Sequence, residues 1–136
     1  MQKKLRAHLK KIYKYSLSAT AAEKIVTENV IYDFSKNLLK IQGKKYNLSK
    51  YKNIYIVGFG KASAALGLAI EKILKAKITD GIIITKYGHS QKLEKIKVCE
   101  ADHPLPNENN IKYTKELLAL VDKANSDDLV IVLISG

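Results

Sequence analysis

Three uninterrupted apolar runs constrain the fold of this chain more than any other feature. They are Ile54–Val57, Ile82–Ile84 and Leu129–Ile134. None of them alternates apolar with polar residues, so each predicts a strand that is buried on both faces, as in a parallel sheet covered by helices. A further strand is expected to begin at Ile96–Val98. The sequence therefore indicates an α/β fold.

Two segments with helical periodicity lie between these strands. One follows the first strand and runs from Ala62 to Leu74, and the other runs from Ile111 to Ala124, with Asn107 as a suitable N-cap in front of it. The order strand, helix, strand, strand, helix, strand predicts an open, mostly parallel sheet with flanking helices. Ligands of such sheets bind at the carboxyl ends of the strands.

The first 52 residues have a different character. Apolar residues at helical spacing predict an amphipathic helix with a basic outer face over the first 16 residues. Thr20–Glu23 matches a capping box that would open a second, short helix. Leu38–Leu48 predicts a hairpin that turns at Gln42-Gly43. We expect residues 1–52 to form a helical and hairpin arm that packs on the core of residues 53–136.

Most of the net charge of +11 belongs to this arm. Residues 1–52 contain 13 basic and 3 acidic side chains, whereas residues 53–136 contain 11 and 10. Such an asymmetry suits either a nucleic-acid or anion partner or a solvated, lysine-rich surface. We favour the solvated surface and do not expect nucleic acid as a partner, because the tyrosines and lysines of the arm match no named nucleic-acid motif.

Nothing in the sequence predicts a secreted or membrane protein. No apolar run approaches the roughly 20 residues that a bilayer requires. The N-terminus is charged from its first residues and has no apolar signal-peptide region. Cys99 is the one cysteine, so the chain has no internal disulfide and suits a reducing compartment. We expect a cytoplasmic protein without a membrane partner.

A glycine pair follows the first buried strand and invites comparison with nucleotide-binding loops. The dinucleotide fingerprint that would begin at Gly58-Phe59-Gly60 needs a third glycine where this chain has Ser63. The fingerprint also needs an acidic residue at the carboxyl end of the second strand, but Asp80 precedes that strand. A Walker A loop also fails, because its first glycine and its magnesium-binding Ser/Thr are missing. The two glycines would still let an anion approach the backbone at a helix N-terminus.

Lys61 is unusual because we expect it in the first turn of the following helix. A cation there opposes the helix dipole, at a cost of about 0.3–1 kcal/mol when exposed. A functional interpretation is that it holds a carboxylate or a transferring phosphate, and the alternative is a lysine that extends into water. His89 and His103 lie in loops at strand ends, but no residue at metal-ligand spacing accompanies them, so no metal site is predicted.

All these residues are expected at one edge of the sheet. The predicted strands end at Gly58–Lys61, Thr85–His89, Asp102–Asn107 and Ser135-Gly136. Parallel strands present their carboxyl ends together, so we expect one site there. The last apolar strand has no helix after it to cover it, and from this we expect the front part of a larger, incomplete domain.

Four segments together resemble the N-terminal domain of the type-2 glycerate kinase family. They occur in the order expected for that family and are IYIVGFGKASAA (54–65), GIIITKYGH (81–89), EADHPLPNE (100–108) and DDLVIVLISG (127–136). Parts of the arm also resemble family members, so the similarity covers nearly the whole chain. The resemblance implies a Rossmann-like N-terminal domain and a smaller C-terminal domain, with the active site between them.

The resemblance also implies an activity and a set of site residues. The reaction would transfer the γ-phosphoryl group of ATP, with Mg²⁺, to the 2-hydroxyl of D-glycerate to give 2-phosphoglycerate. Asn107 stands where the family has an acid, so a charge-dependent role there is in doubt. The implied residues are Lys61 as the catalytic lysine, Gly58, Gly60, His103 and Asn107 at the substrate, and Ser135 and Gly136 at the start of the phosphate loop.

The resemblance implies that the remainder of the kinase site and the C-terminal domain are absent from this chain. We therefore expect the chain to be nearly inactive alone, with a separate chain as a possible source of the missing part. Two alternatives stay open. One is an oxidoreductase of the hydroxypyruvate reductase type, and the other is a non-enzymatic remnant whose basic arm binds anions or nucleic acid.

Overall fold

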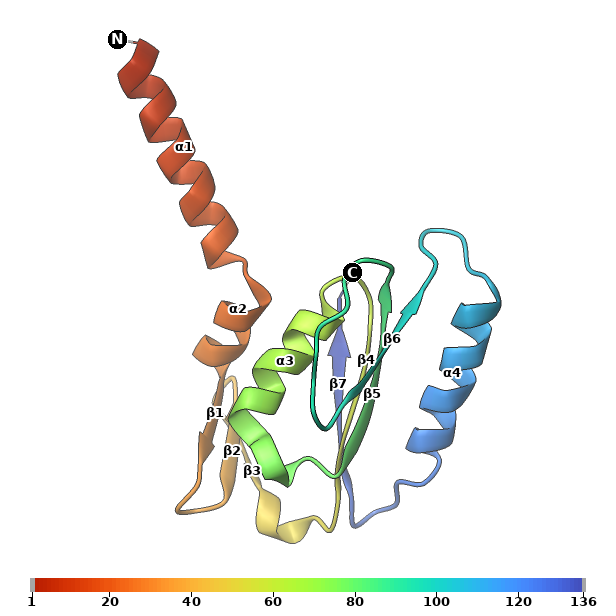
Figure 1. The fold of residues 1–136 in the computed structure, drawn as a ribbon. Coiled ribbons are helices and arrows are strands. Elements are labelled where there is room, and N and C mark those ends of the chain that lie inside the picture. The colour runs from red at the N-terminus through yellow and green to blue at the C-terminus, as the bar shows by residue number, and fades with distance from the viewer. Residues whose placement is uncertain (1, 136) are drawn as a thin grey trace.

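The computed structural model describes residues 2–135 as a four-stranded sheet between helices, a smaller three-stranded sheet and an extended N-terminal helix (Figure 1). The helices are α1 (Gln2–Ala19), α2 (Ala22–Asn29), α3 (Ser63–Leu74) and α4 (Glu108–Val121), with 3₁₀ turns at Leu48–Lys50 and Lys75–Lys77. The strands are β1 (Val30–Asp33), β2 (Leu38–Ile41), β3 (Lys44–Asn47), β4 (Ile54–Phe59), β5 (Asp80–Lys86), β6 (Lys97–Ala101) and β7 (Leu129–Ile134).

The larger sheet is parallel throughout and has the order β6-β5-β4-β7. Its central strand β4 carries core residues on both faces. Ile56 packs with α3 in one apolar cluster, whereas Tyr55 and Val57 pack with Leu120 of α4 in the other. Helices α3 and α4 cover opposite faces (Figure 1). The predicted α/β fold is confirmed, and the apolar runs lack alternation because both faces are covered.

The smaller sheet is antiparallel in the order β1-β2-β3, and its turn follows the prediction. Gln42 and Gly43 both have positive φ, at 46° and 82°, as the tight turn between two antiparallel strands requires. The sequence analysis did not predict β1. The sheet contributes fully buried Leu39 to the same apolar cluster as Ile56, so β1–β3 and the core of the larger sheet are continuous.

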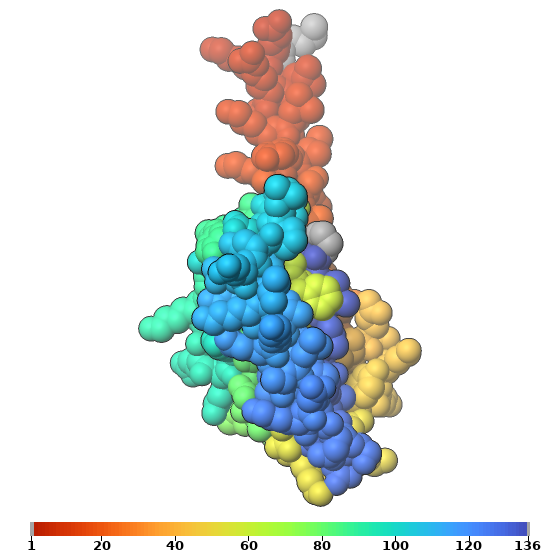
Figure 2. All heavy atoms as spheres, turned by 90° about the vertical axis from the view of Figure 1, so that its right-hand side faces the viewer, coloured from red at the N-terminus to blue at the C-terminus, as the bar shows by residue number. Residues whose placement is uncertain are grey.

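Helix α1 lies outside that core. No residue of α1 is buried, and Figures 1 and 2 show the helix extending away from the body. The capping box predicted at Thr20–Glu23 is wrong. Ala21 is the N-cap of α2 and makes no side-chain cap, because the Thr20 hydroxyl donates back to Ser16 and Leu17 carbonyls of α1. Among residues 2–135, no helix is both long and apolar enough to cross a bilayer.

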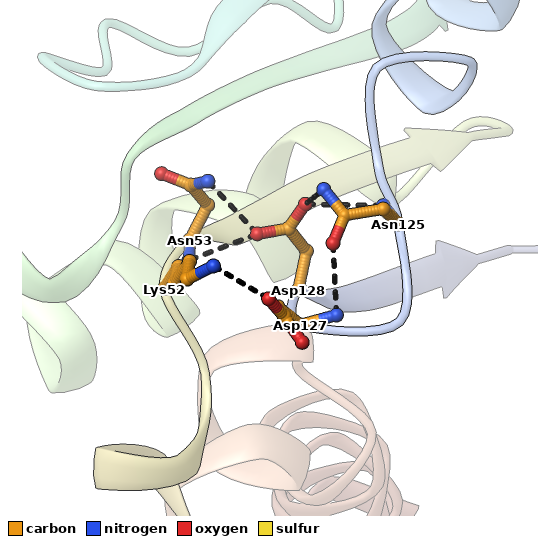
Figure 3. Close-up of polar contacts among 5 residues, drawn as sticks. All are labelled: Lys52, Asn53, Asn125, Asp127 and Asp128. Carbon is orange, nitrogen blue, oxygen red and sulfur yellow. Dashed lines mark hydrogen bonds and ion pairs between the residues drawn. The ribbon is translucent and has the colours of Figure 1, made fainter.

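A polar cluster fixes the amino ends of β4 and β7 (Figure 3). The Asp128 carboxylate accepts hydrogen bonds from the backbone and side-chain nitrogens of both Asn53 and Asn125. Beside it, Lys52 Nζ lies 2.6 Å from Asp127 Oδ2. These contacts set the register of β4 against β7 at the edge of the sheet opposite the strand ends described next.

Candidate functional site

A cavity of about 450 Å³ lies at the carboxyl ends of β4, β5 and β6, beside α4. Two lysines, one carboxylate and one histidine accompany a largely apolar wall. The lining residues are Phe59, Gly60, Lys61, Ile84, Thr85, Lys86, Ala101, Asp102, His103, Asn110, Thr114, Leu117 and Leu118. The cavity therefore lies at the edge of the sheet where the sequence analysis predicted a site.

Gly60 lies where β4 approaches the end of β7 most closely. Its φ is +105°, and a Cβ built there would lie 1.9 Å from the Ser135 carbonyl oxygen. Gly58 is buried within β4 and does not line the cavity, and a Cβ there would meet the Leu133 carbonyl at 2.9 Å. Both glycines are thus needed for close packing of β4 on β7, and Gly60 also borders the cavity.

Lys61 lines the cavity from a turn that precedes α3. The predicted place in the first helical turn is wrong, because α3 begins at Ser63 with Ala62 as its N-cap. The Ser63 hydroxyl donates to the Gly60 carbonyl at 2.6 Å and holds residues 60–62 in this turn. Lys61 is exposed and lies two residues before the first residue of the helix.

His103 and Asn107 come from the same loop but have different surroundings. His103 is exposed and lines the cavity. Asn107 does not belong to the lining. Its side-chain oxygen accepts from the backbone nitrogens of Asn109 and Asn110 and caps α4, and its amide donates to Asp102. The structure therefore confirms the predicted N-cap. The polar groups of the Asn107 side chain are hydrogen-bonded to other residues of the chain.

Ser135 lies beside the turn that carries Lys61. Its backbone nitrogen donates to the Phe59 carbonyl at 3.1 Å, and its hydroxyl accepts from the Ala62 backbone nitrogen at 3.1 Å. Gly136, the other residue predicted at the phosphate loop, lies outside the described residues. The end of β7 is thus bound directly to the Lys61 turn.

Several residues of the cavity were not predicted from the sequence. Lys86 adds a second cation, and Asn110 and Thr114 bring polar groups from α4. Position at the end of β5 was the available signal for Lys86, whereas the α4 residues could be found only from the way that the helix packs. Burial raises the pKa of the Cys99 thiol, which therefore stays protonated at neutral pH and is a poor nucleophile.

A parallel α/β sheet flanked by helices, with a cavity at the carboxyl ends of its strands, defines a Rossmann-like fold. More particularly, the chain belongs to the family described as a domain of unknown function, DUF4147, which matches residues 8–136.

Several relatives carry the name glycerate kinase. The glycerate 2-kinase of Pyrococcus horikoshii is 39% identical over 102 residues, which cover 75% of this chain and 22% of that protein. The D-glycerate 2-kinase of Thermotoga maritima is 38% identical over 122 residues, with 89% of this chain and 28% of that protein covered. The resemblance to glycerate 2-kinases is therefore confirmed.

Solved structures agree with these relatives. The structure of a Pyrococcus horikoshii protein has a TM-score of 0.84 and 32% identity, and covers 97% of this chain and 29% of that one. The structure of the Thermotoga maritima glycerate kinase has a TM-score of 0.76 and 31% identity, with 98% and 29% covered. The chain spans less than a third of the length of these relatives.

The alternative oxidoreductase name also occurs among the relatives. A putative hydroxypyruvate reductase of Agrobacterium vitis is 42% identical over 81 residues, which cover 60% of this chain and 18% of that protein. This match is shorter than those to the two glycerate 2-kinases. The comparisons therefore favour the kinase family over the reductase.

Proposed function

We propose that this chain carries the lysine-containing part of a glycerate 2-kinase site, which transfers the γ-phosphoryl group of ATP to the 2-hydroxyl of D-glycerate. The observation that carries the proposal is the position of Lys61, which lines a cavity at the carboxyl edge of the sheet in a chain whose relatives are named glycerate 2-kinases. The same proposal places the chain in the cytoplasm, where Cys99 needs no disulfide partner.

The chemistry of the reaction explains why cations belong in this cavity. The glycerate 2-hydroxyl oxygen attacks the γ-phosphorus, the bond from the γ-phosphorus to the bridging β–γ oxygen breaks, ADP leaves, and the hydroxyl proton is released to solvent. Negative charge is spread over the phosphoryl oxygens during this transfer, and a fixed ammonium group stabilises it. In our proposal Lys61 supplies that charge, Lys86 adds to it, and His103 forms part of the wall around the substrate.

The described residues hold no group of three or more His, Cys, Asp or Glu side chains that could bind a metal. In our proposal the magnesium ion arrives on ATP, since Mg²⁺ is commonly bound by one or two carboxylates together with substrate phosphates. Asp102 is the carboxylate that lines the cavity. When bound, the ion would neutralise phosphate charge, and we assign it no other role.

Substitution of Lys61 tests the proposal on the chain itself. We expect Lys61→Met to weaken the binding of ATP and D-glycerate about tenfold or more, because one charge-assisted contact is lost. Isothermal titration calorimetry at physiological salt measures both affinities. Lys45→Met is the matched control, since Lys45 is an exposed lysine of β3 outside the cavity. Equal losses in both variants would contradict the proposal.

Catalysis needs a second arm of this experiment. The chain is assayed for ATP-dependent phosphorylation of D-glycerate, alone and mixed with the remaining portion of the Thermotoga maritima relative. We expect little activity alone, and activity in the mixture that Lys61→Met removes. Failure of the wild-type chain to bind either substrate would overturn the proposed function, and full activity of the chain alone would overturn the need for a second chain.

The second candidate, a hydroxypyruvate reductase, would require a nicotinamide cofactor. At the position of the missing third glycine, Ser63 is fully buried and its hydroxyl donates to the Gly60 and Ile84 carbonyls. A titration with NADH separates the two candidates. Binding of NADH in preference to ATP would favour the reductase.

A further inference from the structure

Two side chains from the end of β5 converge on the backbone of Lys61. The Lys61 carbonyl oxygen lies 3.3 Å from Thr85 Oγ1 and 3.2 Å from His89 Nδ1. Thr85 is only 3% exposed, whereas His89 is exposed in the loop that follows the strand. Both contacts reach the main chain of Lys61 and leave its ammonium group free to meet a ligand.

His89 is itself fixed by a third strand. The Glu100 carboxylate on β6 accepts hydrogen bonds from the backbone nitrogens of Gly88 at 2.8 Å and Ser90 at 3.2 Å, which flank the histidine. The His89 backbone nitrogen also donates to the Lys86 carbonyl. The contacts therefore run continuously from β6, through the loop after β5, to the turn after β4.

The same turn is bound on its other side as well. The Gly60 nitrogen donates to the Ile84 carbonyl of β5, and the Ala62 nitrogen donates to the Ser135 hydroxyl after β7. An exposed loop lysine ordinarily loses much conformational entropy when it binds a ligand. A backbone that is already held in place reduces this cost and fixes where the ammonium group can reach.

We infer that His89 and Thr85 are positioning residues, which hold the Lys61 backbone so that its ammonium group serves the cavity. The inference rests on the proposed function, because it assumes that Lys61 binds the transferring phosphoryl group. It assigns His89 a role that acts through Lys61, with no contact between the imidazole and the substrate.

The contact determines which nitrogen of His89 carries the proton. A carbonyl oxygen only accepts hydrogen bonds, so Nδ1 must be the donor. Neutral His89 is therefore the Nδ1–H tautomer, with Nε2 unprotonated. An unconstrained histidine in water prefers the opposite tautomer. This difference gives the hydrogen bond a spectroscopic signature, and the variants described below test the positioning role.

Long-range ¹H–¹⁵N NMR of the full 136-residue chain tests the tautomer. Spectra are recorded at alkaline pH, so that the neutral tautomers are compared. We expect the pattern of the Nδ1–H form for His89 and that of the Nε2–H form for His8, which is exposed on α1 and serves as the control. The same tautomer mixture at both histidines would overturn the inference.

Paired variants test the positioning itself. His89→Asn keeps an N–H donor near the place of Nδ1, whereas His89→Leu removes it, and Thr85→Ser and Thr85→Val form the equivalent pair. The readouts are the ¹³C shift of the Lys61 carbonyl and hydrogen exchange of the Gly60 and Ala62 amides. We expect exchange to rise about five- to tenfold in the Leu and Val variants, as for one lost hydrogen bond, and little in the Asn and Ser variants.

Binding of ATP then separates this inference from the proposed function. If wild type binds ATP, we expect His89→Leu to weaken binding and His89→Asn to restore it. If His89→Leu leaves the Lys61 carbonyl shift, the amide hydrogen exchange and the ATP affinity unchanged, the positioning role is overturned and the proposed function stands. If wild type binds no ATP, the proposed function fails, and with it the assignment of His89 and Thr85 to that function.

Discussion

Gly60 shows how a single residue decides the geometry at the carboxyl edge of the sheet. The sequence places Gly60 in a glycine pair whose backbone an anion could approach. In the structure, the group beside Gly60 is the backbone of Ser135. Its missing side chain lets the backbone of Ser135 lie against β4, where even a Cβ would overlap the carbonyl oxygen. The close contact of the two strand ends in turn fixes the turn that carries Lys61.

Replacing Gly60 tests this account at the residue scale. We expect Gly60→Ala to destabilise the fold by about 3 kcal/mol or more, because a positive φ and an overlap with backbone atoms both oppose the new side chain. Gly43→Ala is the matched control. Gly43 also has a positive φ but nothing within 4 Å, so the expected cost is about 1 kcal/mol. Urea unfolding measures both, and equal costs would refute the packing argument.

At the scale of elements, periodicity predicted most helices and strands correctly. It predicted less well which of them pack on the core. The stripe of apolar residues in α1 suggested a helix that packs on the core, but no residue of α1 is buried. Strand β1 was missed because it follows α2 directly, with no turn between Asn29 and Val30 to mark its start, and its position depends on pairing with β2. Helix α4 was predicted correctly at its start, because Asn107 caps it through neighbouring residues alone.

Two leucines distinguish the packed elements from the exposed one. Leu39 in β2 is 0% exposed, whereas Leu9 in α1 is 56% exposed. We expect Leu39→Ala to lower the free energy of unfolding by about 2–5 kcal/mol, because it leaves a cavity in the shared core. Leu9→Ala should change it by no more than about 0.5 kcal/mol. Thermal and urea unfolding check both, and a large effect of Leu9→Ala would show that α1 has a partner in solution.

At the scale of the whole molecule, charge and chemistry occupy different parts of the chain. The basic arm holds most of the +11, and α1 carries its lysines away from the body (Figure 2). The cavity holds only two lysines, Lys61 and Lys86. The net charge therefore does not mark the cavity, whereas the strand ends do.

The polar cluster in Figure 3 links the stability of the whole fold to pH. Burial raises the pKa of Asp128, but hydrogen bonds from Asn53 and Asn125 outweigh it and hold that pKa below its usual value. A lowered folded pKa stabilises the protein above the unfolded value of about 3.8, and this contribution is lost as pH falls through the folded pKa. We therefore expect wild type to lose part of its stability in that acidic range.

Asp128→Asn checks the sign of this effect. The variant lacks the titrating group and faces the donors of Asn53 and Asn125 with an amide, so it should be less stable than wild type at neutral pH. The difference in Tm should shrink between about pH 5 and pH 2. Asp122→Asn, at the exposed end of α4, is the control. A difference that stays constant with pH would contradict the assignment to Asp128.

The sequence alone determined the parallel α/β sheet and predicted the edge at which the cavity with Lys61 lies. These features depend on local periodicity and on the rule that parallel strands end together. Only the tertiary structure decided that Gly60 packs against Ser135, that Asn107 is occupied as a cap, and that His89 reaches the Lys61 carbonyl. The reason is physical: apart from the Asn107 cap, these contacts join residues far apart in the chain, and their distances are set by how the strands pack.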